Sequence, residues 1–190
     1  MLGQLPTSLK IKGKDFAIRS DYRNIIRIFA AYNAEKLQDA DKIYICLKRI
    51  YVDFDKIPHS WYKEAYTAAM EFIECKMKSD IPMPKVVDWE KDEQLIFAAV
   101  NKVAGQEIRA LEYMHWWTFL GFYQNIDRDD IWGFILTIRQ KKARHRKLEK
   151  HETEFYNANR SMCDIGKYKN KKEEAVAFAD TLYAELAGKE

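Results

Sequence analysis

The chain has 190 residues, of which 47% are hydrophobic and 32% charged, and its formal net charge is +3. This length and apolar content are sufficient for one good core, so we expect one compact unit. A net charge so close to zero excludes a chain that is basic throughout, as a general nucleic-acid binder would be.

The cysteines and the first residues bear on the compartment. Cys46, Cys75 and Cys163 are widely spaced and odd in number, and they form no ligand pattern, which favours a reducing environment. The start lacks the features of a secretory signal, and no window approaches about 18 consecutive apolar residues. We expect a soluble cytoplasmic protein with no membrane partner.

The first part of the chain, residues 1–79, is predicted to be a β-hairpin followed by three helices. Residues 8–20 alternate apolar and polar on both sides of Gly13-Lys14, which is typical of a hairpin. Ser20 or Asp21 can cap a helix over residues 22–32. Apolar residues at helical spacing predict further helices over 41–52 and 61–78.

Two prolines, Pro82 and Pro84, exclude a helix over the next stretch, and we take residues 80–87 as a linker. Asp88 is expected to cap a fourth helix that ends at Gly105. A fifth helix over 112–124 and a sixth over 131–138 complete a central aromatic helical core, residues 88–138.

The predicted helix over 112–124 leaves almost no polar face, so it is either buried in the centre or covered by a partner. Its adjacent Trp116 and Trp117 point about 100° apart, and one core must accept both rings unless a groove or self-association surface takes one. The candidate core or partner-binding residues are Tyr113, Trp116, Trp117, Leu120 and Trp132.

Residues 139–190 are expected to form a basic helix and a C-terminal helix. The basic stretch loses the wide apolar stripe, so a helix projecting to about residue 159, or a mobile arm, is predicted. The last helix carries its apolar residues between 175 and 186. The fold class is therefore mainly α, a bundle of about six to seven helices with a short N-terminal β-hairpin. The candidate interaction residues of the basic stretch are Arg139, Lys141, Lys142, Arg144, Arg146 and Lys147.

No motif for catalysis, phosphate binding or metal binding is present in the sequence, so we expect no enzyme activity, cofactor or metal. His115 is either a proton switch or ligand, or a core residue whose ring nitrogens are satisfied, and the second reading is favoured. Asp127, Asp129 and Asp130 are faintly similar to a calcium loop, but helix capping explains them better.

The basic stretch has two readings as an interaction site. It could neutralise phosphates, or it could meet an acidic protein surface. Nucleic-acid binding is disfavoured because stacking aromatic residues are not interleaved with the cations.

The chain resembles the phage gene-product-fifteen family, regarded as tail assembly chaperones of long-tailed, siphovirus-type bacteriophages of Gram-positive bacteria. The resemblance covers nearly the whole chain. It rests on residues 9–14, 20–23 and 88–96, on His115-Trp116-Trp117 with Phe119 and Leu120, and on Ile138-Arg139.

The resemblance implies a non-enzymatic chaperone with two phage partners. It would cover the apolar helical faces of the tape measure protein and help recruit subunits of the major tail protein, and it admits self-association. It would act in the host cell cytoplasm and be absent from the mature virion. The alternatives are a nucleic-acid-binding regulator acting through residues 139–150 and a structural component retained in the virion.

Overall fold

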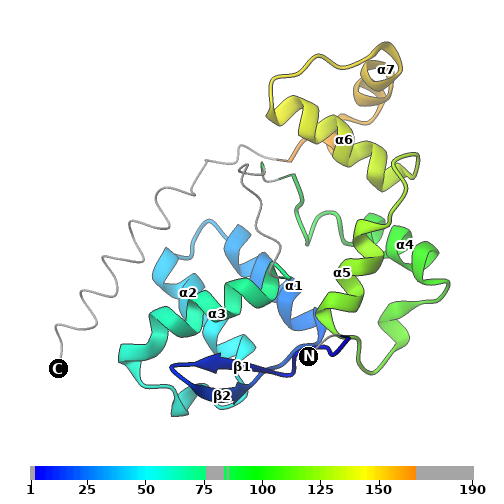
Figure 1. Ribbon diagram of the computed structural model, residues 1–190. Helices are drawn as coiled ribbons and strands as arrows, with labels where there is room; N and C mark the ends of the chain where they lie inside the picture. Colours follow the sequence, from blue (N-terminus) through cyan, green and yellow to red (C-terminus); the bar gives the residue numbers. More distant parts are fainter. Residues whose placement is uncertain (1–2, 76–83, 85, 166–190) are drawn as a thin grey trace. The chain divides into compact units, whose positions relative to one another are not determined.

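The computed structural model describes residues 3–75, 84 and 86–165. Over these residues the chain is mainly helical with one antiparallel hairpin, which confirms the predicted fold class (Figure 1). The strands are β1 (Ser8–Ile11) and β2 (Lys14–Ala17). The α-helices are α1 (Tyr22–Asn33), α2 (Asp39–Ile50), α3 (Tyr62–Ile73), α4 (Glu93–Ala104), α5 (Trp116–Gln124), α6 (Ile131–Ala143), α7 (Lys150–Ala158) and α8 (Arg160–Cys163). Short 3-10 turns lie at Phe54–Lys56, His59–Trp61 and Ile108–Ala110.

The hairpin forms where the alternation predicted it. Leu9 pairs with Phe16 and Ile11 pairs with Lys14, which leaves a two-residue turn. Both turn residues have positive φ, 45° at Lys12 and 84° at Gly13. A turn of this kind matches the twist of antiparallel strands, and glycine adopts its second position without a steric penalty.

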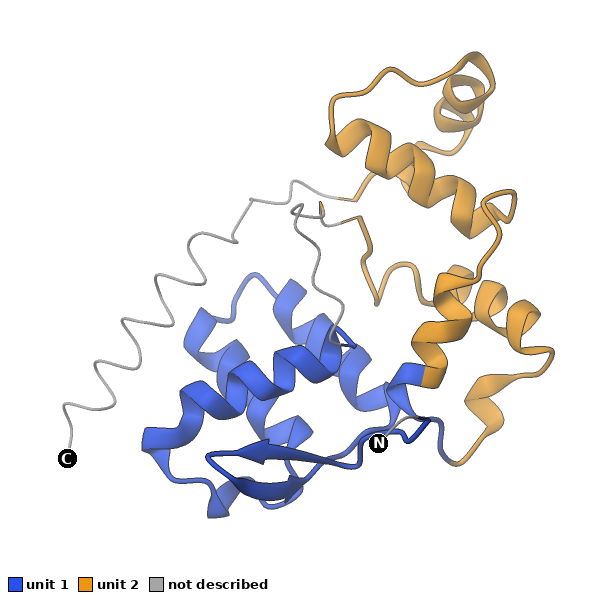
Figure 2. Cartoon of the chain, viewed as in Figure 1, with its two compact units in different colours: residues 1–78, 113–117, 171–190 blue, residues 79–112, 118–170 orange. Residues whose placement is uncertain are grey.

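The described residues belong to two compact units, not to the one unit that we expected (Figure 2). Unit 1 contains residues 3–75 and 113–117, and unit 2 contains the described residues among 79–112 and 118–165. We expected residues 113–117 to belong with the central aromatic helical core, but they belong to unit 1. Local sequence patterns do not show this, because it depends on hydrogen bonds to Ser20 and Asp21, about ninety positions away. Of the expected linker, 80–83 and 85 lie outside the described residues, as does the predicted helix over 175–186.

Helices α1, α2 and α3 pack with the hairpin to form the core of unit 1. Its fully buried side chains include Tyr22, Leu47, Tyr51 and Phe72. The Tyr51 hydroxyl donates a hydrogen bond of 2.7 Å to the carbonyl oxygen of Ala65, so the ring is buried without leaving its polar end unsatisfied.

Two helices of the central region begin later than predicted. The Asp88 carboxylate accepts hydrogen bonds from the backbone N–H groups of Glu90 and Lys91, which makes a turn, and α4 begins only at Glu93. Helix α4 ends at Gly105, as predicted, with a left-handed φ of 69°. Helix α5 begins at Trp116, not near residue 112, because residues 113–115 pair with the start of α1.

The predicted continuation of the sixth helix through the basic stretch is wrong. Helix α6 ends at Ala143, and His145 takes a φ of 53°, which a continuing helix does not allow. Helix α7 then begins at Lys150, and the ring of Phe155 packs edge-on against Phe134 of α6 with centroids 5.0 Å apart. The stretch therefore folds back onto α6 instead of projecting from it.

Candidate functional site

Residues 113–117, the aromatic segment, are attached to unit 1 by backbone hydrogen bonds. The Tyr22 N–H donates to the carbonyl oxygen of Met114 over 3.0 Å, and the Trp116 N–H donates to the carbonyl oxygen of Ser20 over 2.7 Å. These two bonds form an antiparallel bridge at the start of α1. The aromatic segment is thus fixed to the N-terminal hairpin and helices, from which it is distant in sequence.

The side chains of Ser20 and Asp21 strengthen this junction. One carboxylate oxygen of Asp21 caps α1 by accepting from the Arg23 N–H over 2.9 Å. The other accepts from the Met114 N–H over 3.1 Å. The hydroxyl groups of Ser20 and Tyr113 lie 2.8 Å apart and share a hydrogen bond. The predicted cap residue therefore also holds the aromatic segment.

Trp116 and Trp117 both reach the C-terminal end of α3. The indole N–H of Trp116 donates to the carbonyl oxygen of Ile73, and that of Trp117 donates to the carbonyl oxygen of Phe72, each over 2.8 Å. The last carbonyl groups of a helix have no partner within the helix, so the two indoles satisfy them. Trp116 is 2% exposed and Trp117 is half-buried, so unit 1 accommodates both rings.

His115 is buried, with its ring packed edge-on against the rings of Phe72 and Trp117, and it caps α5. Its Nδ1 accepts the backbone N–H of Trp117 over 3.0 Å, so the ring proton must be on Nε2, which donates to the carbonyl oxygen of Pro6 over 3.0 Å. Both ring nitrogens are therefore satisfied, and the histidine is the N-cap of α5. This is the reading that the sequence favoured, a core histidine.

The C-terminal part of α5 and the start of α6 belong to unit 2. Phe119 is buried among the rings of Trp89, Phe97 and Tyr123, with ring centroids 6.1 to 6.5 Å from its own. Leu120 is half-buried, and Trp132 is fully buried. The candidate residues Leu120 and Trp132 thus take part in the packing of unit 2.

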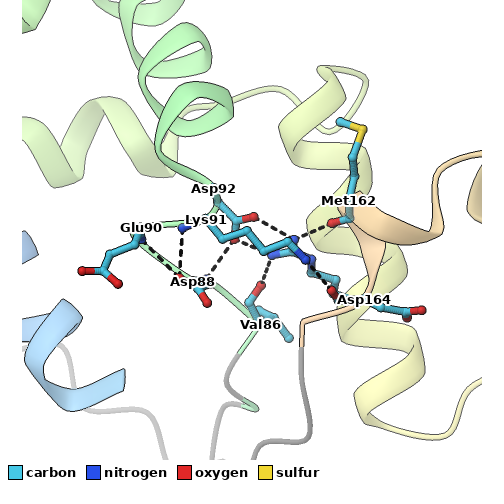
Figure 3. A network of polar contacts seen from close by, with 8 residues as sticks. Val86, Asp88, Glu90, Lys91, Asp92, Met162 and Asp164 are labelled. Carbon is cyan, nitrogen blue, oxygen red and sulfur yellow. Dashed lines mark hydrogen bonds and ion pairs between the residues drawn. The ribbon is translucent and has the colours of Figure 1, made fainter. Parts of the chain in front are cut away.

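Arg139, the first residue of the basic stretch, lies in the interior of unit 2. Its guanidinium forms two bonds with the Asp92 carboxylate, of 2.6 and 2.8 Å, and both side chains are 2% exposed. It also donates to the carbonyl oxygens of Val86 and Met162, over 2.9 and 2.5 Å (Figure 3). Arg139 therefore joins three separate segments of unit 2 and is not available to a partner.

Two further cations of the basic stretch are paired with nearby acids. Lys141 donates to Glu152 over 2.5 Å, and this hydrogen bond raises the pKa of the lysine. Lys142 donates to Asp164 over 2.5 Å, and this bond lowers the pKa of the aspartate. These ion pairs connect α6 to α7 and to the residue after α8, which is a stabilising use of the charge.

Arg144, Arg146 and Lys147 remain exposed in the loop between α6 and α7. Of the candidate aromatic residues, Tyr113 is 54% exposed and the others are buried or half-buried. The sequence-predicted site residues are divided between the two units, with residues 113–117 in unit 1 and the others in unit 2. Most of them stabilise the two units, and Tyr113 and the three loop cations are the ones that a partner can reach.

Residues 1–164 match the protein family described as bacteriophage Gp15 protein. The chain belongs to this bacteriophage Gp15 family. No curated protein and no solved structure matches it. The Gp15 match covers the whole hairpin, the aromatic segment and the Arg139 network, so these features lie within the family region of the chain.

The described part of this Gp15 chain contains no group of three or more His, Cys, Asp or Glu side chains placed to hold a metal ion. Asp130 caps α6 by accepting from the Trp132 N–H, as the capping reading predicted. Among the helices that the structure describes, none has the length and apolarity needed to span a bilayer.

Sequence reasoning missed one surface feature of the Gp15 chain, a groove between α1 and α2. Four cations line it, Arg19, Arg27, Lys48 and Arg49. Residues 22–33 contain arginine but no aspartate or glutamate, which was the available signal. The groove itself could not be found that way, because it exists only where the two helices pack.

Proposed function

We propose that this protein is a non-enzymatic tail assembly chaperone that binds the tape measure protein and helps to recruit subunits of the major tail protein. The observation that carries the proposal is the match of residues 1–164 to the bacteriophage Gp15 family. The resemblance of its hairpin and aromatic segment to such chaperones supports the same role. We place its action in the host cell cytoplasm, before the finished particle.

Exposed apolar side chains supply contact surface for such a role. On unit 1 they include Tyr44, Val52 and Tyr113, and on unit 2 they include Ile131, which is 58% exposed. Large apolar side chains in water favour association with an apolar partner surface. A tape measure helix with an extended apolar face would be covered by contacts of this kind.

The aromatic segment supports the proposal as a scaffold. Its indoles and histidine are hydrogen-bonded within unit 1, and they hold the nearby exposed side chain of Tyr113 on a fixed backbone. Preorganised surfaces lose less conformational entropy on binding than surfaces that must first order.

Co-expression with a phage tape measure protein tests the proposal. We expect higher soluble yield of the tape measure protein and co-purification of the two chains. Replacing Tyr44 and Ile131 by serine should reduce co-purification, and replacing the exposed, polar Thr153 by serine is the matched control. An insoluble tape measure protein that never co-purifies would contradict the proposal.

The two alternatives are tested separately. Mass spectrometry of purified virions should not detect the chain if it is a chaperone, and should detect it if it is a retained structural component. Salt-dependent binding to generic duplex DNA, lost in an Arg144→Glu/Arg146→Glu variant, would favour a nucleic-acid-binding regulator. Because Arg139, Lys141 and Lys142 are already paired within unit 2, a phosphate-binding role would depend on Arg144, Arg146, Lys147 and Lys150.

A further inference from the structure

The groove between α1 and α2 of unit 1 has a volume of about 530 Å³, which is within the range of ligand-binding clefts. Arg27 of α1, Lys48 and Arg49 of α2, and Arg19 before α1 line it, and Ala31 and Ile45 supply apolar surface. No carboxylate group lines it. It is therefore a cationic groove with an apolar component, within a single unit.

Part of this charge has a role in the fold. Arg19 donates hydrogen bonds to the carbonyl oxygens of Lys48, Tyr51 and Val52, where α2 ends. Lys48 and Arg49 lie in the last turn of α2, where positive charge interacts favourably with the helix dipole. These contacts explain why cations lie at the end of α2, but they do not account for all four cations that line the groove.

The charge of Arg27 has no such explanation. It lies in the middle of α1, far from either helix end, and its side chain is exposed. Within residues 3–75, 84 and 86–165, the side chains of Arg27 and Arg49 form no ion pair or hydrogen bond. Two guanidinium groups are thus directed at one groove without an acidic partner.

The lining of the groove selects the chemistry of its ligand. Guanidinium groups bind carboxylates with two parallel hydrogen bonds, and Ala31 and Ile45 favour an apolar strip between those carboxylates. A nucleic acid strand would need aromatic side chains for base stacking, and none lines this groove. An amphipathic helix with acidic residues beside its apolar stripe meets both requirements.

We infer that the α1–α2 groove of unit 1 is a docking site for an acidic amphipathic helix of a partner protein. The inference deepens the proposed function and rests on it for one point only, that the helix belongs to a phage tail protein. Long-range attraction between the cations and the acidic helix speeds encounter, and the apolar strip sets the register. Binding should weaken as salt is added, because Arg19, Arg27 and Lys48 are exposed to solvent.

Fluorescence anisotropy with the full chain tests the inference. The probe is a labelled model helix of about 18 residues with leucine and alanine on one face and glutamate beside it. The comparison probes are the same peptide with lysine in place of glutamate, the peptide with its leucines scrambled, and a generic DNA duplex. We expect the acidic amphipathic peptide to bind most tightly.

The decisive variant is Arg27→Glu/Arg49→Glu, which should weaken binding of the acidic peptide by roughly tenfold. Arg128→Glu/Lys150→Glu makes the same charge change at exposed positions of unit 2 and should leave the affinity unchanged. Circular dichroism checks that each variant is folded, and Arg27→Gln/Arg49→Gln replaces the first variant if the reversal prevents folding.

Three outcomes overturn the inference: no binding of the acidic peptide to the folded chain, equal losses in the groove and control variants, or tighter binding of the DNA duplex that depends on Arg27 and Arg49. Failure here can be told from failure of the proposed function. If the tape measure protein co-purifies but the peptide does not bind, only the inference about the groove is rejected. If the peptide binds at the groove but the tape measure protein does not co-purify, only the proposed chaperone function is rejected.

Discussion

Arg139 and Asp92 are 47 positions apart in the chain and form a two-pronged ion pair in the interior of unit 2, with N–O distances of 2.6 and 2.8 Å. The guanidinium also binds two backbone carbonyl groups, and the carboxylate also accepts the Asp88 N–H over 2.9 Å (Figure 3). Buried charges are tolerated when such bonds satisfy them. The pair therefore joins α4, α6 and the residues around α8.

Breaking this pair from one side should destabilise unit 2 strongly. Asp92→Asn or Arg139→Met leaves one buried group without its partner, and we expect a loss of about 3 to 5 kcal/mol in the free energy of unfolding. Urea denaturation followed by circular dichroism measures it. Lys147→Met, at an exposed position of the same stretch, is the control. If Arg139→Met unfolds at the same urea concentration as Lys147→Met, the pair has no such role.

The two adjacent tryptophans should differ in their effect on stability. Trp116→Ala removes a side chain that is 2% exposed and leaves the carbonyl oxygen of Ile73 without its indole donor, so we expect a loss of about 3 to 5 kcal/mol. Trp117 is half-buried, and Trp117→Ala should cost less. Thermal and chemical denaturation compare them. Lost partner binding with unchanged melting of Trp116→Ala would make this ring a binding residue.

The capping role of His115 can be separated from its burial. His115→Asn keeps a side-chain acceptor for the Trp117 N–H but is too short to reach Pro6, whereas His115→Ala loses both bonds. Loss of an N-cap costs about 1 kcal/mol, so the alanine variant should be less stable than the asparagine variant by about that amount. Equal stability of the two variants in urea would exclude the cap.

The Lys142–Asp164 pair should make stability depend on pH in the acidic range. The hydrogen bond from Lys142 lowers the pKa of the Asp164 carboxyl in the folded state. Its contribution is therefore fully present above the pKa of the unfolded carboxyl, about 4, and is lost as pH falls through the lowered value. Asp164→Asn should destabilise the protein at pH 7 and have little effect near pH 2. Asp129→Asn, which removes the same charge at an exposed position, serves as the reference.

Two helical glycines should respond in opposite directions to alanine. A Cβ at Gly133 of α6 would lie 2.1 Å from the carbonyl oxygen of Asp127, so the backbone must shift and Gly133→Ala should destabilise the protein. A Cβ at Gly121 of α5 meets no atom within 4 Å. Alanine is favoured over glycine inside a helix, and Gly121→Ala should stabilise by about 0.5 to 1 kcal/mol. Differential scanning calorimetry distinguishes the two signs.

Local features of this protein could be read from its sequence. The alternation around Gly13, the Asp21 cap and the Gly105 stop were all predicted and are all present, because each depends on residues within a few positions of each other. The same holds for Asp130 at the start of α6. The resemblance of the aromatic segment to a phage family was also available from sequence, and the match of residues 1–164 agrees with it at family level.

Only the tertiary structure decided what these side chains contact. The sequence predicted Arg139 as a residue that contacts a partner, but its side chain is buried because it pairs with Asp92, 47 positions away in the chain. Trp116 and His115 join unit 1 because Ser20, Ile73 and Pro6 present carbonyl oxygens there. Hydrogen bonds and packing between distant segments leave no periodic signal in the chain. The cationic α1–α2 groove likewise forms only where two helices pack against each other, so no sequence pattern predicts it.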